Sequence, residues 1–127
     1  MAQGAQSMIK LTFCLHRLPH FSRAEFQDYW INRHGPLVAS VSQALKIRRY
    51  VQMHSLPDAE AAPFARVRGA PGPYDGVAQL WWDSLEDLAT DTPEARAAGA
   101  LLLEDERKFI DLPRSPLWLG EEKVIFS

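Results

Sequence analysis

Residues 21–37 read FSRAEFQDYWINRHGPL, and this stretch decides how the first half of the chain folds. Ser22, followed three residues later by Glu25, forms a capping box, in which each side chain bonds the other residue's backbone at a helix start. Phe21 and Phe26 stand at the positions of a hydrophobic staple. Two independent devices therefore predict a helix that begins after Ser22.

A proline sets the expected end of this helix. Pro36 disfavours helical geometry at Gly35, so we expect the helix to stop near His34. A second helix is expected to begin at Pro36, because proline suits the first helical position. The first helix should present three aromatic side chains on one face, namely Phe26, Tyr29 and Trp30.

Alternating apolar and polar residues predict four strands, at 8–17, 46–56, 74–83 and 118–126. Further helices are expected after Ser84 and Thr92, which are favoured helix caps. Two halves of the order strand–helix–helix–strand predict an α+β fold, a ferredoxin-like four-stranded antiparallel sheet with helices on one face. The strands carry apolar residues on both faces, so we expect the uncovered face to pack against a second copy as a homodimer.

Residues 57–73 hold four of the nine prolines and show no clear periodicity. We expect a long loop, which either serves function or is a floppy insertion. The length of 127 residues fits one domain over 1–127.

Composition narrows the classes of function. Fourteen Lys and Arg against sixteen Asp and Glu leave a net charge of -2, without the basic face of a nucleic-acid binder. Cys14 is the only cysteine, so neither an intrachain disulfide nor a Cys-rich zinc site can form. No secretory signal pattern and no apolar run of about 18 residues is present, which predicts a cytoplasmic protein without a membrane span.

Several motifs together resemble the EthD-type family. The similar segments are Phe26-x-x-Tyr29-Trp30-x-x-x-His34-Gly35-Pro36-Leu37, Arg49-Tyr50-Val51, Tyr74-Asp75-Gly76-Val77 and Trp81-Trp82-x-Ser84. The resemblance spans most of the chain outside 57–73 and implies a dimeric α+β barrel with a cleft between sheet and helices. Relatives include methylmuconolactone isomerases, cofactor-free polyketide oxygenases, and fungal polyketide dehydratases and decarboxylases.

His34 is the first candidate for catalysis. It lies four residues after Trp30, so it continues the inward face of the helix if helical geometry persists. A helix C-terminus favours the cationic ring and burial favours the neutral one, a balance suited to acid–base work near neutral pH. The alternative is a structural histidine that bonds the backbone and fixes a helix break. The resemblance to lactone isomerases implies proton transfer at His34, but Leu80 stands where those enzymes have a cysteine, which disfavours the same isomerisation.

Six more residues are candidates for contact with a substrate. Tyr29 and His54 are candidate catalytic residues, while Trp30, Tyr50, Gln79 and Trp82 are candidate substrate-binding residues. Tyrosine and histidine can hold a substrate oxygen, and tryptophan can stack on an aromatic ligand. For each of them, simple packing in the core or in a dimer interface is the competing interpretation.

The leading hypothesis is a cofactor-independent acid–base enzyme, a lyase or isomerase of the dehydratase, cyclase, decarboxylase or isomerase type. Its substrate would be a small aromatic, lactone or polyketide-like compound of catabolism or secondary metabolism. A cofactor-free monooxygenase and a non-enzymatic accessory dimer that binds an apolar metabolite are the alternatives. No phosphate loop or dinucleotide fingerprint is present, and Pro19 interrupts the His16–His20 spacing, so we expect neither cofactor nor metal.

Overall fold

A computed structural model describes residues 8–127. Four strands form one antiparallel sheet, namely β1 (Ile9–Leu15), β2 (Arg49–His54), β3 (Gly76–Trp82) and β4 (Leu117–Glu121). Their order across the sheet is β2-β3-β1-β4, which is ferredoxin-like and confirms the predicted fold class. All four predicted strands exist, but each is shorter than its alternating segment.

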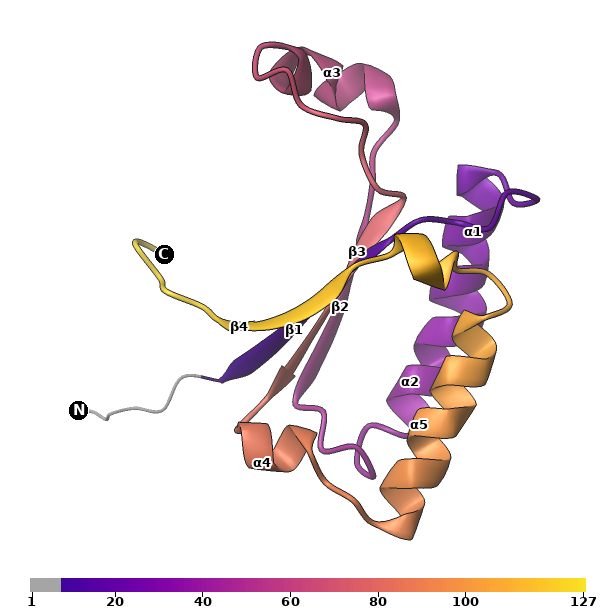
Figure 1. The fold of residues 1–127 in the computed structure, drawn as a ribbon, viewed down its shortest axis with the longest axis vertical. Helices are drawn as coiled ribbons and strands as arrows, with labels where there is room; N and C mark the ends of the chain where they lie inside the picture. Colours follow the sequence, from indigo (N-terminus) through magenta and orange to yellow (C-terminus); the bar gives the residue numbers. More distant parts are fainter. Residues whose placement is uncertain (1–7) are drawn as a thin grey trace.

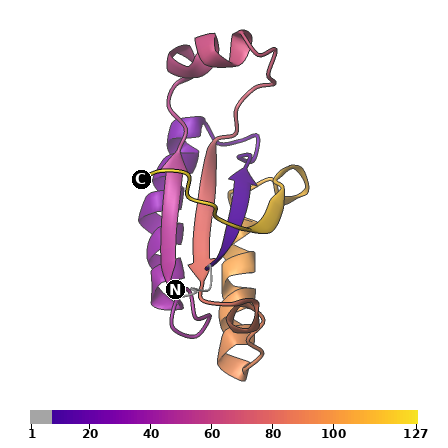
Figure 2. The ribbon, with the colours of Figure 1, turned by 90° about the vertical axis from the view of Figure 1, so that its left-hand side faces the viewer.

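The helical segments are α1 (Arg23–Tyr29), the π-helical turn η1 (Trp30–His34), α2 (Gly35–Ser40), α3 (Asp58–Arg66), α4 (Leu85–Leu88), α5 (Pro93–Glu106) and the short 3-10 turn η2 (Leu112–Arg114). The continuous segment from α1 to α2 and the long helix α5 cover one face of the sheet, and the opposite face is open among the described residues (Figures 1 and 2). None of the described helices has the length and apolarity that crossing a membrane requires.

The start of α1 follows the sequence prediction in atomic detail. The Ser22 hydroxyl accepts from the Glu25 backbone N–H at 3.0 Å, and Glu25 accepts from the Ser22 N–H at 2.8 Å. Ser84 and Thr92 likewise accept from backbone N–H groups at the starts of α4 and α5. The three predicted helix caps are therefore confirmed.

The predicted break near His34 is wrong. Helical geometry continues from α1 through η1 into α2, and Gly35 keeps helical angles of φ -54° and ψ -52°. The Gly35 N–H bonds the Trp30 carbonyl, five residues back, so the chain takes one extra residue per turn here. This wider turn accommodates Pro36, whose ring would otherwise clash with the preceding helical turn.

The predicted loop at 57–73 is also wrong in part, because it contains α3. Residues 59–65 include four alanines, the best helix formers, and Asp58 and Glu60 place negative charge in the first helical turn. Pro63 lies inside the helix and masked this propensity in the sequence. Figure 1 shows α3 standing away from the sheet and the other helices.

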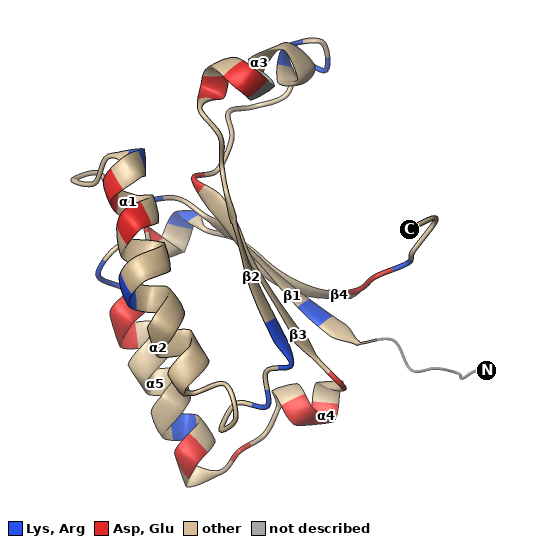
Figure 3. Ribbon diagram, turned by 180° about the vertical axis from the view of Figure 1, so that it is seen from behind, with Lys and Arg blue, Asp and Glu red and all other residues tan. Residues whose placement is uncertain are grey.

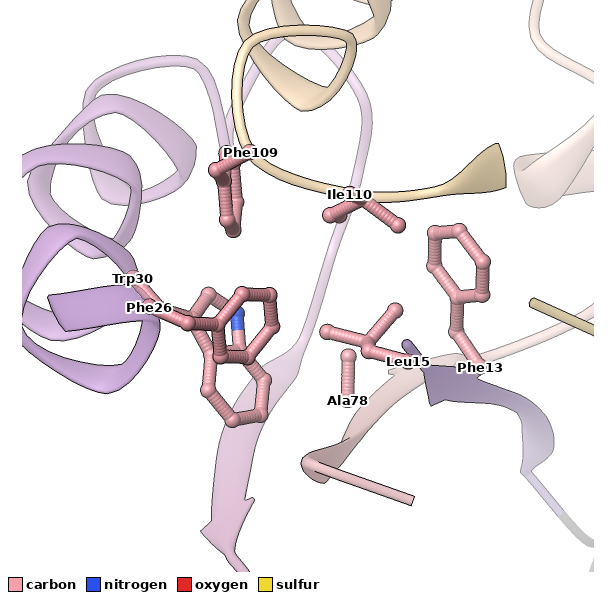
Figure 4. Close-up of a cluster of buried hydrophobic side chains, with 7 residues drawn as sticks. All are labelled: Phe13, Leu15, Phe26, Trp30, Ala78, Phe109 and Ile110. Carbon is pink, nitrogen blue, oxygen red and sulfur yellow. The ribbon is translucent and has the colours of Figure 1, made fainter. Parts of the chain in front are cut away.

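The core lies between the sheet and the helices (Figure 4). Its members come from both layers, namely Phe13, Leu15, Phe26, Trp30, Ala78, Phe109 and Ile110. Trp30 sits directly over Gly76, where an added Cβ would lie 2.8 Å from the indole Cη2 and 2.9 Å from the Met53 carbonyl oxygen. Only glycine fits at this position.

A buried carboxylate fixes the end of the sheet from which α3 projects. Asp75 accepts from the Arg17 backbone N–H at 2.8 Å and pairs with the Arg17 guanidinium. Arg23 Nε lies 3.3 Å from the same carboxylate, and its guanidinium reaches Asp58 at 2.9 Å. Arg23 therefore joins the start of α1 to the first residue of α3.

Candidate active site

His34 ends the π-helical turn and is buried between η1 and α5, with 5% of its surface exposed. Its Nδ1 lies 2.8 Å from Asp105 Oδ2, and its ring packs on Phe109 with centroids 5.1 Å apart. The ring is thus held by a carboxylate on α5 and not by the backbone of a helix break. Within residues 8–127 the other ring nitrogen, Nε2, has no hydrogen-bond partner.

Asp105 also binds Tyr29, whose hydroxyl donates to Oδ1 at 2.7 Å. Burial would raise the pKa of Asp105, but the hydrogen bonds from Tyr29 and His34 outweigh it and the pKa is lowered. Burial and the bond to Asp105 raise the pKa of Tyr29 to about 12. The Tyr29 hydroxyl therefore keeps its proton at neutral pH and donates it in the hydrogen bond to Asp105.

These contacts fix the tautomer of His34. An ionised Asp105 is an acceptor only, so His34 Nδ1 must carry the proton that bridges the pair. The neutral ring then bears its lone pair on Nε2. Burial lowers the pKa of His34, against the opposing pull of Asp105. The result is a neutral base at pH 7, oriented by a carboxylate.

A second chain of hydrogen bonds runs along β2 on the face that meets the helices. Gln52 Nε2 donates to the Tyr50 hydroxyl at 2.8 Å and to the Trp30 carbonyl at 2.9 Å, and Gln52 Oε1 lies 2.8 Å from His54 Nε2. The predicted shared face of Tyr50 and His54 is thus present, with Gln52 between them. The Tyr50 phenol accepts from Gln52, and within residues 8–127 its own proton has no acceptor.

Glu106 adds an ionisable group next to Asp105. Burial, reinforced by the negative charge of Asp105, raises the pKa of Glu106 to about 7. Burial raises the pKa of Tyr50, and the negative charge of Glu106 adds to this shift. The sequence predicts an apolar stripe along this helix, in which Glu106 is the one polar residue; its other members are Ala95, Ala98, Gly99, Leu102, Phe109 and Ile110.

The remaining candidates lie elsewhere. Trp30 is 1% exposed and stacks on His54, with ring centroids 4.6 Å apart. Trp82 is 5% exposed, and its Nε1 donates to the Leu45 carbonyl at 2.7 Å. Gln79 points to the open face of the sheet, because it alternates with the core residue Ala78. Their contact with a substrate stays a prediction.

Neither of two prominent clefts on the described part of the molecule includes His34. The larger, of about 870 Å³, lies under α3 and reaches His54. The smaller, of about 340 Å³, lies near η2 and the end of α5. Because only 5% of the His34 surface is exposed, a substrate can reach Nε2 only after side chains that cover the ring move.

Asp105 is a functional candidate that the sequence interpretation misses. It lies three residues after Leu102 and four before Phe109, both buried, so the helical period itself places it inward. The predicted inward stripe of α5 includes Glu106 and leaves Asp105 outside. A carboxylate at the spacing of a buried stripe is the signal that could have found it.

The geometry thus defines a ferredoxin-like protein with a buried carboxylate–histidine pair. The family model described as EthD domain matches residues 18–113, and the chain belongs to this family. No curated protein matches it in sequence.

Solved structures show the same fold. An ethyl tert-butyl ether d (EthD) family protein from Bacillus halodurans C-125 is 23% identical, with a TM-score of 0.59 over 91% of this chain and 99% of that one. An EthD-like protein from Ralstonia eutropha JMP134 is 22% identical, with a TM-score of 0.59 over 96% and 97%. A protein from Bacteroides fragilis, described as dimeric, ferredoxin-like and of unknown function, is 13% identical, with a TM-score of 0.58 over 92% and 98%.

Proposed function

We propose that this protein is a cofactor-independent acid–base enzyme in which His34 transfers the proton. The observation that carries the proposal is the 2.8 Å contact between His34 Nδ1 and Asp105 Oδ2. A carboxylate that holds Nδ1–H leaves Nε2 as the base, the arrangement that enzymes use to orient a catalytic imidazole.

The energetics of Asp105 support a role beyond packing. It is buried in the last turn of α5, where the helix dipole disfavours negative charge by about 0.3–1 kcal/mol. Burial of the carboxylate adds a further cost. Tyr29 and His34 offset both effects. Two helical segments, α1–η1 and α5, thus supply residues whose contacts meet at one carboxylate, and the main consequence is to orient His34.

The proposed step is proton abstraction next to a carbonyl. His34 Nε2 takes the proton, the C–H electron pair becomes the π bond of an enolate, and the imidazolium returns the proton at another atom. The free Tyr50 proton would bond the enolate oxygen, and Glu106 would supply a second exchangeable proton. Small aromatic ketones, lactones and polyketide-like compounds carry such acidic C–H groups, which fits the dehydratase, cyclase, decarboxylase or isomerase types.

Solvent exchange tests this step even when the product is unidentified. Anthrone, α-angelica lactone and benzoylacetone would each be incubated with the protein in deuterated buffer, and deuterium uptake followed by mass spectrometry. We expect acceleration with at least one compound and its loss in His34→Gln. The matched control is His20→Gln, which removes an exposed ring. Equal acceleration by His34→Gln would reject the assignment.

Oxygen consumption, measured with the same compounds, separates the oxygenase alternative. A cofactor-free monooxygenase would consume oxygen with the substrate, so an oxygen electrode reports it. A reaction that proceeds under nitrogen excludes it.

One observation favours an accessory binding protein as the second candidate. His34 is almost fully covered, whereas the 870 Å³ cleft under α3 is open and mainly apolar. This candidate predicts thermal stabilisation by a compound that is recovered unchanged. Any chemical change in that compound would count against it.

We further propose that the chain forms a homodimer through the open face of its sheet. Charged residues occur only at the ends of the strands or near them, which leaves the middle of the sheet uncharged (Figure 3). On that face Met53 and Trp118 are each about half exposed, at 51% and 52%. The structures from Bacteroides fragilis and from Thermobifida fusca are described as dimeric, which supports the proposal.

A further inference from the structure

The cleft under α3 is a separate candidate site. It lies between α3, the following segment and the end of β2, and its volume of about 870 Å³ falls in the range of small-molecule sites. The walls are mainly apolar, with contributions from Met53, Leu56, Ala62, Ala65 and Pro71. The polar side chains in its lining are His54, Ser55, Asp58 and Arg66.

Gln52 determines the state of the histidine in this wall. Its Nε2 is 2.9 Å from the Trp30 carbonyl oxygen, which can only accept, so this atom must be the amide nitrogen. The other amide atom, Oε1, is therefore an acceptor, and it lies 2.8 Å from His54 Nε2. His54 Nε2 must donate this bond and carry the ring proton.

The neutral His54 ring then has its lone pair on Nδ1. Within residues 8–127 this nitrogen has no partner. Burial lowers the pKa of His54, which keeps the ring neutral at pH 7 and Nδ1 an acceptor. The stack on Trp30, with centroids 4.6 Å apart and planes 27° apart, holds the ring in place.

Two of the other polar groups in the lining are already paired. The Ser55 hydroxyl donates to the Tyr74 carbonyl at 2.6 Å, and Asp58 accepts from Arg23 at 2.9 Å. Arg66 is exposed and stands at the rim. The half-buried side chain of this lining that keeps an unpaired nitrogen is therefore His54, whose Nδ1 can accept one donor from a ligand.

We propose that this cleft binds an apolar ring compound that carries one hydroxyl donor, a phenol or an enol, with the hydroxyl on His54 Nδ1. The apolar body fills the space against Met53, Leu56, Ala62 and Ala65. The site is distinct from the His34–Asp105 pair, since neither residue lines the cleft. It stands whether or not His34 is catalytic.

Two probes of matched shape test the donor requirement. Calorimetry would compare 1-naphthol with 1-methoxynaphthalene, which keeps the rings but has no hydroxyl proton. One hydrogen bond contributes about 0.5–1.5 kcal/mol, so we expect 1-naphthol to bind about two- to twelvefold more tightly. Equal affinity of the two probes, or no binding by either, would overturn the proposal. The absence of binding is the result expected if a second copy of the chain fills the cleft.

The variant His54→Phe tests whether the hydroxyl of 1-naphthol bonds His54. His54→Phe keeps an aromatic ring against Trp30 but lacks Nδ1, so the affinity for 1-naphthol should fall to that for 1-methoxynaphthalene. His20→Phe, at an exposed histidine outside the cleft, should leave the preference unchanged. A preference that persists in His54→Phe places the bond elsewhere and rejects the role of His54.

Nitrogen-15 NMR of the unaltered protein gives the same answer if His54→Phe fails to fold. We expect the neutral His54 ring to be protonated at Nε2, and 1-naphthol to shift the Nδ1 resonance and the backbone resonances of residues 53–73. A ring protonated at Nδ1, or shifts centred on His34, would overturn the proposal.

Discussion

Asp105, in the last turn of α5, joins two side chains of the α1–η1 segment, with Oδ2 at 2.8 Å from His34 Nδ1 and Oδ1 at 2.7 Å from the Tyr29 hydroxyl. One carboxylate thus accepts from both partners at once. His34 depends on this contact for its tautomer, and its catalytic competence should depend on it as well.

Asp105→Asn tests that dependence. The amide carries no charge, so burial acts alone on His34 and its pKa should fall further below its ordinary value. Loss of the oriented base should lower turnover at least about a hundredfold, within the usual contribution of acid–base catalysis. NMR titration and the deuterium assay measure the two effects. Glu104→Gln, which removes an exposed carboxylate of the same helix, should change neither.

Tyr29→Phe distinguishes a positioning role from a catalytic one. Without the hydroxyl, Asp105 loses a hydrogen bond that favours its charged form, so its pKa should rise. A whole bond to a charged group contributes about 1.5–3 kcal/mol, which corresponds to roughly ten- to hundredfold. If Tyr29 only positions Asp105, His34 keeps its own bond to the carboxylate, so turnover should fall by less than this. A loss as large as that of His34→Gln would instead make Tyr29 part of the chemistry.

The pH dependence of stability should report Glu106. Its folded pKa of about 7 lies above its ordinary value of 4.5, so the folded state binds the proton more tightly. The stability that this preference contributes is full below about pH 4.5 and is lost as the pH rises through 7. Glu106→Gln should therefore be more stable than the parent at pH 8, by on the order of 2 kcal/mol, with the difference vanishing near pH 4.5. Chemical denaturation at both pH values measures it, and a difference that does not depend on pH would contradict the shift.

The sheet and the helices that cover it are predictable from the sequence, because the local signals for each element agree with the way the elements pack. The Ser22–Glu25 capping box and the alternation of Ile9, Leu11, Phe13 and Leu15 each act over a few residues, and the packing in the structure follows both. His34 could be singled out because it extends the inward face of Phe26 and Trp30.

The partner of His34 could not be predicted with the same ease. Asp105 is 71 residues away in sequence, and only the packing of η1 against α5 brings the two together. The continuous helix at Gly35 depends on a π-helical turn, which no local propensity encodes. The cleft under α3 depends on how that helix projects from the sheet, which the alanine content alone does not determine.

Gly76→Ala tests the close approach of Trp30 to β3. An added methyl group would meet the indole ring and the Met53 carbonyl, and neither has room to move in the core. Overpacking of this kind costs about 1–3 kcal/mol or more, so thermal unfolding should occur at a clearly lower temperature. Gly99→Ala is the matched control, because Gly99 lies on the exposed side of α5 and an added Cβ meets nothing within 4 Å. It should stabilise the helix by about 0.5–1 kcal/mol.

Val51→Asp tests the proposed homodimer. Val51 lies at the middle of β2 on the open face, opposite Gln79 of β3, so an aspartate there would bury a charge between two facing sheets. Sedimentation should show a dimer for the parent and a monomer for Val51→Asp. Ala100→Asp adds the same charge to the exposed side of α5 and should remain dimeric. If the parent is a monomer at micromolar concentration, or if Val51→Asp still dimerises, the open face is not the interface, and its half-exposed Met53 and Trp118 require another explanation.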